Sequence, residues 1–269
     1  MTRRSREKQH QGPSRRIALI LEYEGTDYQG FQLQAQGSTI QGEVEKALEH
    51  FTGVKNRIRG ASRTDSGAHA KGQVVDFLTN APYTINTFVN ALNDSLPPQV
   101  KVTGAHEVPL AFNSRRDALS RVYCYTILNS PYPSPLLRNY AFWVRKPLNV
   151  EAMLEEARSL VGRHNFSPLT LKLTPGRSAM RHVTRWDVRR EGDLVFIEAE
   201  ANSFLPHQVR KCNRLLVEIG LGKWPPGKVS LVLNGNPEEA RHIPLLPAKG
   251  LCLMKVNYPD FVLASDGAK

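Results

Sequence analysis

One short stretch of the chain combines a carboxylate and a guanidinium in a setting that suits chemistry. Residues 60–70 read GASRTDSGAHA, with Arg63 and Asp65 two positions apart. On an extended backbone, residues at this spacing point to the same side, so both side chains can face one ligand. Glycines at 60, 67 and 72 let the backbone turn sharply and approach a ligand closely. The stretch predicts a loop that aims one carboxylate at one atom, although Asp and Gly are also ordinary β-turn residues.

The elements around this loop follow from the alternation and spacing of apolar residues. Strands are expected at 54–58 and 73–78 on either side of it, and at 16–23 and 100–108. Helices are expected to begin at Ser38, with Gln41 in the capping-box position, and at Thr84. The order β-α-β-β-α-β is typical of a ferredoxin-like arrangement.

The second part of the chain repeats a mixture of strands and helices. The expected elements are a strand at 121–128, a helix from Asn149 to Val161, a hairpin of 181–190 and 194–201, a helix capped by Ser203 and a strand at 250–256. A mobile loop is expected at 168–180. On the last helix an apolar stripe faces inward, and Arg210, Lys211 and Arg214 are expected to form a basic outer side.

Composition indicates the kind of partner. The 269 residues carry a formal net charge of +11 and a pI near 9.7. Such a protein attracts polyanions, and the clustering of arginines favours nucleic acid because the guanidinium suits phosphates and stacks on bases. A basic surface that serves only solubility is the alternative.

The absence of certain sequence signals indicates the cellular compartment of the protein. It has no apolar run of about 18 residues, so no membrane span is expected, and no apolar region follows the N-terminal charges, so no secretory signal is expected. Cys124, Cys212 and Cys252 are too few and too far apart for a disulfide framework or a zinc knuckle. We expect a reducing, cytoplasmic setting.

The run at 60–70, with GQVV at 72–75, resembles the central motif of the TruA-type tRNA pseudouridine synthases. In that family the motif reads Gly-x-Gly-Arg-Thr-Asp-x-Gly-Val-His-Ala, and its Asp is catalytic. Here Ser62 stands in place of a Gly and Ala68 in place of a Val, and Asn165 replaces an Asp in a later motif. The further motifs that resemble the family are EYEGTDYQGFQ at 22–32, FNSRRDA at 112–118, RVYCY at 121–125, GRHNF at 162–166 and FLPHQVR at 204–210.

The resemblance spans 16–257 and implies roles for individual residues. Asp65 would be catalytic, Arg210 would pair with its carboxylate, and Tyr123 would stack against the target uracil. Arg63 is placed to fill the space that the extruded base leaves. The expected RNA contacts are Phe112, Asn113, Ser114, Arg115, Arg116 and Arg181. From the residues alone, Arg210 reads as helix-surface charge, Tyr123 as half-buried packing and the Arg pair as solvated charge.

The implied reaction is an isomerisation of uridine in the anticodon stem-loop of tRNA, at positions 38, 39 and 40. It breaks the N1–C1′ bond and joins C5 to C1′, so it needs no cofactor and no metal, and the sequence offers no phosphate-binding glycine loop and no Cys-x-x-Cys. Asp65 and His69 lack a third metal ligand at matching spacing. The alternatives are a non-catalytic RNA-binding module and a metal-dependent hydrolase.

The expected fold class is α+β, with two ferredoxin-like or RRM-like halves that share a mostly antiparallel sheet around a central basic cleft. The expected divisions are a disordered basic arm at 1–15, halves at 16–113 and 114–257, and a tail at 258–269. The resemblance also implies a homodimer, with tRNA as the partner.

Overall fold

The computed structural model describes residues 13–171, 176, 178–234 and 243–259. The chain divides into two compact units, one formed by Met1–Leu119 with Val256–Lys269 and the other by Ser120–Lys255. Helices and mostly antiparallel strands occur in both, so the predicted α+β class is confirmed. That two halves share one sheet around a basic cleft stays a prediction.

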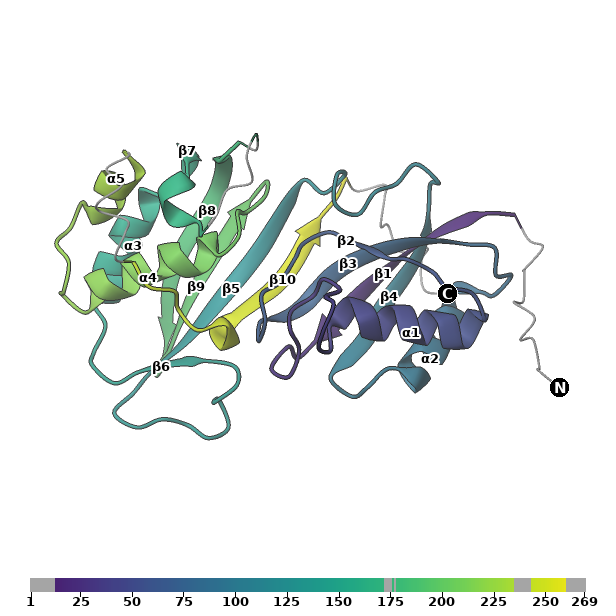
Figure 1. Cartoon of the computed structure of the whole chain (residues 1–269). Helices are drawn as coiled ribbons and strands as arrows, with labels where there is room; N and C mark the ends of the chain where they lie inside the picture. The colour runs from purple at the N-terminus through teal and green to yellow at the C-terminus, as the bar shows by residue number, and fades with distance from the viewer. Residues whose placement is uncertain (1–12, 172–175, 177, 235–242, 260–269) are drawn as a thin grey trace. The chain divides into compact units, whose positions relative to one another are not determined.

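The described part of the first unit has four antiparallel strands and two helices. Its elements are β1 (Arg15–Tyr23), α1 (Ile40–Thr52), β2 (Arg59–Gly60), β3 (His69–Thr79), α2 (Ile85–Ser95) and β4 (Val100–Val108). The strand order is β4-β1-β3-β2, and Leu19 of β1 lies opposite Val75 of β3 and Ala105 of β4. The helices α1 and α2 lie side by side on this sheet (Figure 1). The predicted β-α-β-β-α-β order is found.

Two local predictions in this unit are wrong. Thr39, not Ser38, caps α1, because its side chain accepts a hydrogen bond from the Gly42 amide. The carbonyl of Ser38 instead accepts from the Gln29 amide, which keeps Ser38 outside the helix. The stretch 54–58 is not a strand, since the Asn56 side chain bonds to Thr52 and to the carbonyl of residue 54 and so competes with sheet pairing.

In the second unit the strand order is β10-β5-β9-β8-β7, with β6 parallel to β5. Its strands are β5 (Ser120–Asn129), β6 (Phe142–Val144), β7 (Gly162–Asn165), β8 (Met180–Glu191), β9 (Leu194–Ala201) and β10 (Leu251–Asn257). Its helices are α3 (Val150–Arg158), α4 (Gln208–Gly220), α5 (Lys228–Leu233) and the short 3-10 turns η1 (Ser167–Leu169) and η2 (Ala248–Gly250). The helices α3 and α4 pack against one another, and α3 packs on β8 (Figure 1).

Asn149 caps α3 as predicted, and Gly192 forms the turn of the predicted β8–β9 hairpin. The helix ends earlier than predicted, at Arg158, because 3-10-type bonds tighten the next turn before Gly162 redirects the chain. Residues 1–12, 172–175, 177 and 260–269, which include most of the predicted arm and tail and part of the predicted mobile loop, lie outside the described residues.

The last long helix differs most from prediction. It begins at Gln208, five residues after Ser203, so Ser203 is not its cap. Lys211 is buried, and its Nζ donates to the carbonyl of Thr170 at 3.2 Å. Arg214 is paired with Glu218 on the same helix. The predicted basic outer side is therefore wrong, because α4 is covered on nearly all sides. Among the described residues, no helix is both long enough and apolar enough to cross a membrane.

Candidate active site

The loop between β2 and β3 carries Arg63 and Asp65 on either side of Thr64 in the sequence. Thr64, between them, is buried, whereas Arg63 is exposed and Asp65 is half-buried. The Thr64 hydroxyl bonds to the hydroxyl of Tyr23 at 2.8 Å, and its carbonyl accepts from the Phe31 amide at 3.1 Å. Thr64 is thus anchored within the fold, while its two neighbours are more accessible, and their shared orientation stays a prediction.

The segment after β1 braces the far side of this loop. The Tyr28 carbonyl accepts from the Ser66 hydroxyl at 3.0 Å and from the Gly67 amide at 3.3 Å. A Cβ on Gly30, which has φ of +84°, would lie 2.7 Å from the Thr64 carbonyl oxygen. A Cβ on Gly25 would overlap the carbonyl of residue 68. The two backbones approach so closely that only glycine fits at these positions.

Gln73, a buried glutamine on β3, braces the part of the loop that precedes Arg63. The Oε1 atom of Gln73 accepts from the Ser62 amide at 3.2 Å, and its Nε2 donates to the Ser62 carbonyl at 2.6 Å. The Ala61 amide also donates to the Val74 carbonyl at 2.8 Å. Sequence analysis did not assign this role to Gln73, although an amide in an otherwise apolar strand is the signal of a satisfied internal bond. The loop is thus fixed on both flanks of Asp65.

His69, weighed earlier as a metal ligand with Asp65, takes part in the same bracing. Its Nδ1 accepts a hydrogen bond from the Gly25 amide at 3.1 Å, and the ring is buried. Within the described ranges, no group of three or more His, Cys, Asp and Glu side chains is placed to hold a metal ion. The geometry therefore explains His69 as a structural residue of the loop.

The predicted RNA-contacting segment forms a compact turn at 112–117. The Oδ1 atom of Asn113 accepts from the amides of Arg115 and Arg116, both at 3.1 Å, so it closes the turn. The side chains of Arg115 and Arg116 are exposed. Phe112 is buried and packs against Tyr258, with ring centroids 5.4 Å apart.

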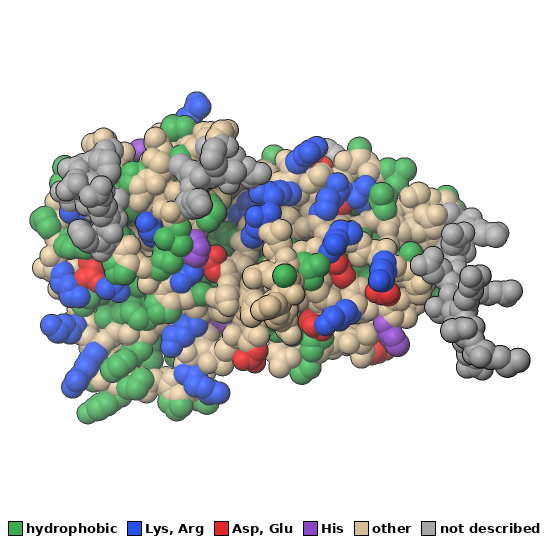
Figure 2. All heavy atoms as spheres, in the orientation of Figure 1, with side chains coloured by type: hydrophobic (Ala, Val, Ile, Leu, Met, Phe, Trp, Pro, Cys, Tyr) green, Lys and Arg blue, Asp and Glu red, His purple; other side chains and the backbone are tan. Residues whose placement is uncertain are grey.

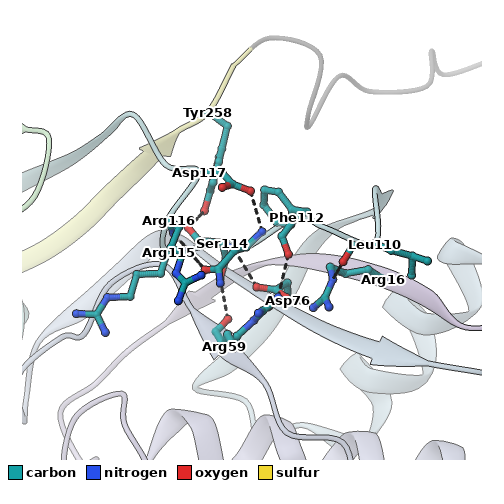
Figure 3. Close-up of polar contacts among 11 residues, drawn as sticks. Arg16, Arg59, Asp76, Leu110, Phe112, Ser114, Arg115, Arg116, Asp117 and Tyr258 are labelled. Atoms are coloured by element: carbon teal, nitrogen blue, oxygen red, sulfur yellow. Dashed lines mark hydrogen bonds and ion pairs between the residues drawn. The ribbon is translucent and has the colours of Figure 1, made fainter.

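Ser114 fastens the turn to the sheet through a buried carboxylate. Its amide donates to Oδ1 of Asp76 at 2.9 Å, and its hydroxyl donates to the Arg59 carbonyl at 2.9 Å. The other carboxylate oxygen of Asp76 accepts from Arg16 at 2.6 Å and from Arg59 at 2.5 Å. Figure 3 shows Asp76 beneath the turn with Arg16 and Arg59 on either side of it. The turn that displays the arginine pair is therefore held by a charged anchor.

The pKa of Asp76 reflects these opposing influences. Burial alone would raise the pKa of the carboxyl, but hydrogen bonds from Arg59, Ser114 and Arg16 together lower it below its ordinary value. Sequence analysis missed this residue, although an Asp between Val75 and Phe77 in a buried strand must have partners.

In the other unit, Tyr123 lies on β5 and is buried. Its ring meets Phe204 edge-on at 5.4 Å, and Phe204 in turn meets Trp186 at 6.2 Å. Tyr125, two positions on, is fully buried, and its hydroxyl donates to the Pro247 carbonyl at 2.8 Å. Burial raises the pKa of Tyr125. Tyr123 therefore belongs to a row of packed aromatic rings.

The two remaining predicted residues also belong to this unit. Arg210, on the first turn of α4, donates from Nε to the Leu246 carbonyl at 2.7 Å, and its Nη1 lies 3.3 Å from Nδ1 of His207. Arg181, on β8, donates from Nη1 to the carbonyls of Ser178 and Met180 at 2.9 and 2.7 Å. Burial lowers the pKa of Arg181.

Charge on the visible surface agrees with the composition. In the view of Figure 2, the blue side chains of Lys and Arg clearly outnumber the red side chains of Asp and Glu. A net charge of +11 spread in this way attracts an anionic polymer.

Comparisons with known proteins agree with the motifs. Residues 19–115 and 157–259 match the profile of the family described as tRNA pseudouridine synthase. The chain is 40% identical over 244 residues to a protein of Geotalea daltonii named tRNA pseudouridine synthase A, covering 91% of this chain and 100% of that protein. It is 38% identical over 246 residues to the protein of the same name from Bartonella tribocorum, covering 90% of this chain and 99% of the relative. A protein of that name from a Roseiflexus species is 40% identical over 250 residues, covering 91% of this chain and 92% of the relative. With a braced Arg-Thr-Asp loop in the family's central motif and matches of this extent, the chain belongs to the tRNA pseudouridine synthase family.

Proposed function

We propose that this enzyme isomerises uridine to pseudouridine in tRNA and that Asp65 is the reacting carboxylate. The observation that carries the assignment is the loop itself, which is fixed on both flanks while Asp65 stays half-buried at its outer side. A reacting group held by such a frame keeps its geometry when substrate binds.

The chemistry that this carboxylate must support conserves all atoms of the nucleoside. The N1–C1′ bond breaks, the uracil turns, C5 bonds to C1′, and the proton that leaves C5 is balanced by the one that N1 gains. Asp65 serves as a nucleophile toward the sugar or the base, or as the base that removes a sugar proton. In each route the residue must be ionised and held close to the atom of the target nucleoside that it attacks or deprotonates.

The target base has to leave its stack before Asp65 can reach it. Extrusion costs a few kcal/mol, which stacking of about 1–3 kcal/mol on an aromatic ring offsets in part. We assign this stacking to Tyr123, whose ring is fixed by Phe204. Arg63, exposed next to the reacting residue, fills the vacated position in the RNA.

The family motif assigns Arg210 to the carboxylate of Asp65. A guanidinium within about 4–6 Å favours the ionised form of a carboxyl group, and it would keep Asp65 reactive after water is excluded. The assignment predicts that loss of the Arg210 charge slows the reaction more than it weakens tRNA binding.

The proposed RNA-contacting residues are of two kinds: exposed arginines that can bind RNA, and residues that fix the turn carrying two of these arginines. Arg115 and Arg116 face solvent and would bind phosphates, and Arg181 would add a further contact. Asn113, Phe112 and Ser114 fix the turn from within, so their loss would weaken binding indirectly.

Finer features of the proposal rest on the resemblance. We propose that the modified uridines lie in the anticodon stem-loop, that the enzyme acts in the cytoplasm as a homodimer, and that the reaction uses neither cofactor nor metal. Excess EDTA should then leave activity unchanged, and no RNA cleavage should be seen. Inhibition by EDTA or cleavage of the RNA would favour a metal-dependent hydrolase.

The central test replaces the carboxylate. Unmodified tRNA transcripts are incubated with Asp65→Asn, and pseudouridine is mapped by carbodiimide modification. We expect the rate to fall by more than about 10³-fold while tRNA binding persists, because only the reacting group is lost. The matched control is Asp94→Asn on the exposed side of α2, which should behave as wild type.

Two results would contradict the proposal. Normal product formation by the Asp65→Asn variant would remove Asp65 from the chemistry. A wild-type enzyme that binds tRNA but forms no pseudouridine would favour the non-catalytic RNA-binding module.

A further inference from the structure

His207 has an unusual backbone conformation. Its φ of 62° makes it the single non-glycine residue with positive φ among those that the structure describes. A side chain with a Cβ is strained in this left-handed region, and the non-glycine residues that occupy it are enriched in Asn, Asp and His. Histidine is thus among the residues that tolerate the conformation, but the surrounding structure must still hold it.

The local cause is a turn that is fixed on both sides of His207. The buried side chain of Gln208 accepts from the Leu205 amide at 2.8 Å, and the Gln208 amide donates to the Leu205 carbonyl at 3.1 Å. The Pro206 carbonyl accepts from the Thr170 hydroxyl at 2.8 Å. Neighbouring structure of this kind can hold a residue in a strained conformation.

Helix capping does not account for the imidazole. His207 occupies the N-cap position of α4, but in the described chain its side chain forms no capping hydrogen bond. If only the backbone mattered, glycine would adopt the same turn without strain. The ring must therefore be explained by what it contacts.

The ring contacts Arg210, one turn further along α4. The Arg210 guanidinium is held at Nε by the Leu246 carbonyl, at 2.7 Å, and at Nη1 by Nδ1 of His207, at 3.3 Å. Because a guanidinium only donates, Nδ1 must be the acceptor, so a neutral His207 carries its proton on Nε2. Two contacts at different nitrogens fix both the position and the plane of the group.

We propose that His207 is a positioning residue for Arg210 and that its ring sets the orientation in which the guanidinium acts on Asp65. The proposal rests on the proposed function, in which Arg210 supports the ionised carboxylate. Orientation matters because a charged hydrogen bond weakens steeply when its geometry is poor.

Two substitutions distinguish the effect of the imidazole ring from the effect of the left-handed backbone conformation. His207→Gly removes the ring and relieves the left-handed strain, so the midpoint of thermal unfolding should stay level or rise. His207→Asn also tolerates the left-handed region, and its Oδ1 occupies nearly the position of the imidazole Nδ1, so it restores an acceptor. His50→Asn, at an exposed position in the last turn of α1, is the matched control.

The readouts are the single-turnover rate of pseudouridine formation at saturating tRNA, tRNA affinity by filter binding, and the unfolding midpoint. We expect His207→Gly to lose about tenfold in rate through misplacement of Arg210, with affinity changed by less than about threefold. His207→Asn should recover most of the rate. A merely structural role would instead lower the midpoint of His207→Gly and leave the rate of the folded fraction unchanged.

Other outcomes would show whether the positioning role of His207 or the proposed function itself is wrong. A wild-type rate in His207→Gly, or an equal loss in His207→Gly and His207→Asn, would overturn the positioning role. The same holds if Arg210→Met turns over normally while Asp65→Asn is inactive, although the proposed function then stands. Activity in Asp65→Asn would overturn the proposed function itself.

Discussion

Replacing Asp76 by Asn should destabilise the unit that carries the Arg-Thr-Asp loop. Asp76 is 0% exposed and binds two guanidinium groups, from Arg16 with 10% and from Arg59 with 42% side-chain exposure. Asn keeps the size and one acceptor but removes the charge. Arg16 is then left as a buried cation without its counter-ion, whereas Arg59 can turn toward water.

The magnitude follows from this asymmetry. Breaking a buried ion pair by removing one partner costs about 3–5 kcal/mol. The contribution of Arg59 is discounted because that side chain is partly solvated. We therefore expect a loss of about 3 kcal/mol at pH 7, or about 6–12 °C in the unfolding midpoint for a protein of this size.

The pH dependence supplies a second measurement. The pKa of Asp76 is lowered in the folded protein, so its stabilising contribution is present above the ordinary value of 3.8 and is lost as pH falls through the lowered pKa. Urea unfolding of wild type and Asp76→Asn should differ by a constant amount between about pH 6 and 8, and the difference should shrink below about pH 4.

Two results would refute the reasoning. One is a loss smaller than about 1 kcal/mol at pH 7, which is within the range of an ordinary surface change. The other is a difference that persists unchanged in acid. Asp94→Asn, with an exposed carboxylate on α2, is the control and should shift stability by no more than about 0.5 kcal/mol.

Three further predictions concern the loop, the arginine turn and the thiols. Gly25→Ala should lower the single-turnover rate by at least about tenfold, because its Cβ would overlap the Ala68 carbonyl and displace the loop. Arg116→Ala should weaken tRNA binding and reduce the slope of log affinity against log salt by about one, as expected for one lost phosphate contact. In the native enzyme, a disulfide reagent that releases a coloured thiolate should react with the partly exposed Cys252, whereas Cys212 should react only after unfolding, because complete burial raises its pKa.

Patterns that depend on neighbours in the chain were predictable from the sequence. Thr84 and Asn149 cap helices as expected, and the β8–β9 hairpin follows from alternation and the glycine turn. Ser38 failed as a cap because its carbonyl bonds to Gln29 outside the helix, and Ser203 failed because the turn between Leu205 and Gln208 comes before α4. The capping preference of a residue does not show which of these hydrogen bonds will form.

The candidate site divides in the same way. Asp65 and Arg63 could be found from their spacing and motif, because both lie in one short loop. The groups that hold the loop, such as Tyr23 and Gln73, come from other strands, and nothing near them in the sequence marks their role. The burial of Lys211 was not predicted, because the helical periodicity of the sequence does not show that the Thr170 carbonyl accepts a hydrogen bond from its ammonium group.

The return of the chain's end to its first unit has a consequence for biosynthesis. The Tyr258 hydroxyl bonds to the Ser114 carbonyl, the Tyr258 ring covers Phe112, and the carbonyl of Asn257 accepts from the Leu119 amide. Residues 112–119 are therefore synthesised roughly 7–28 s before these partners at ordinary elongation rates. Until residues 257 and 258 emerge, the basic turn is held by Ser114 and Asp76, so a chain cut short before them would keep this anchor but lack the cover of Tyr258.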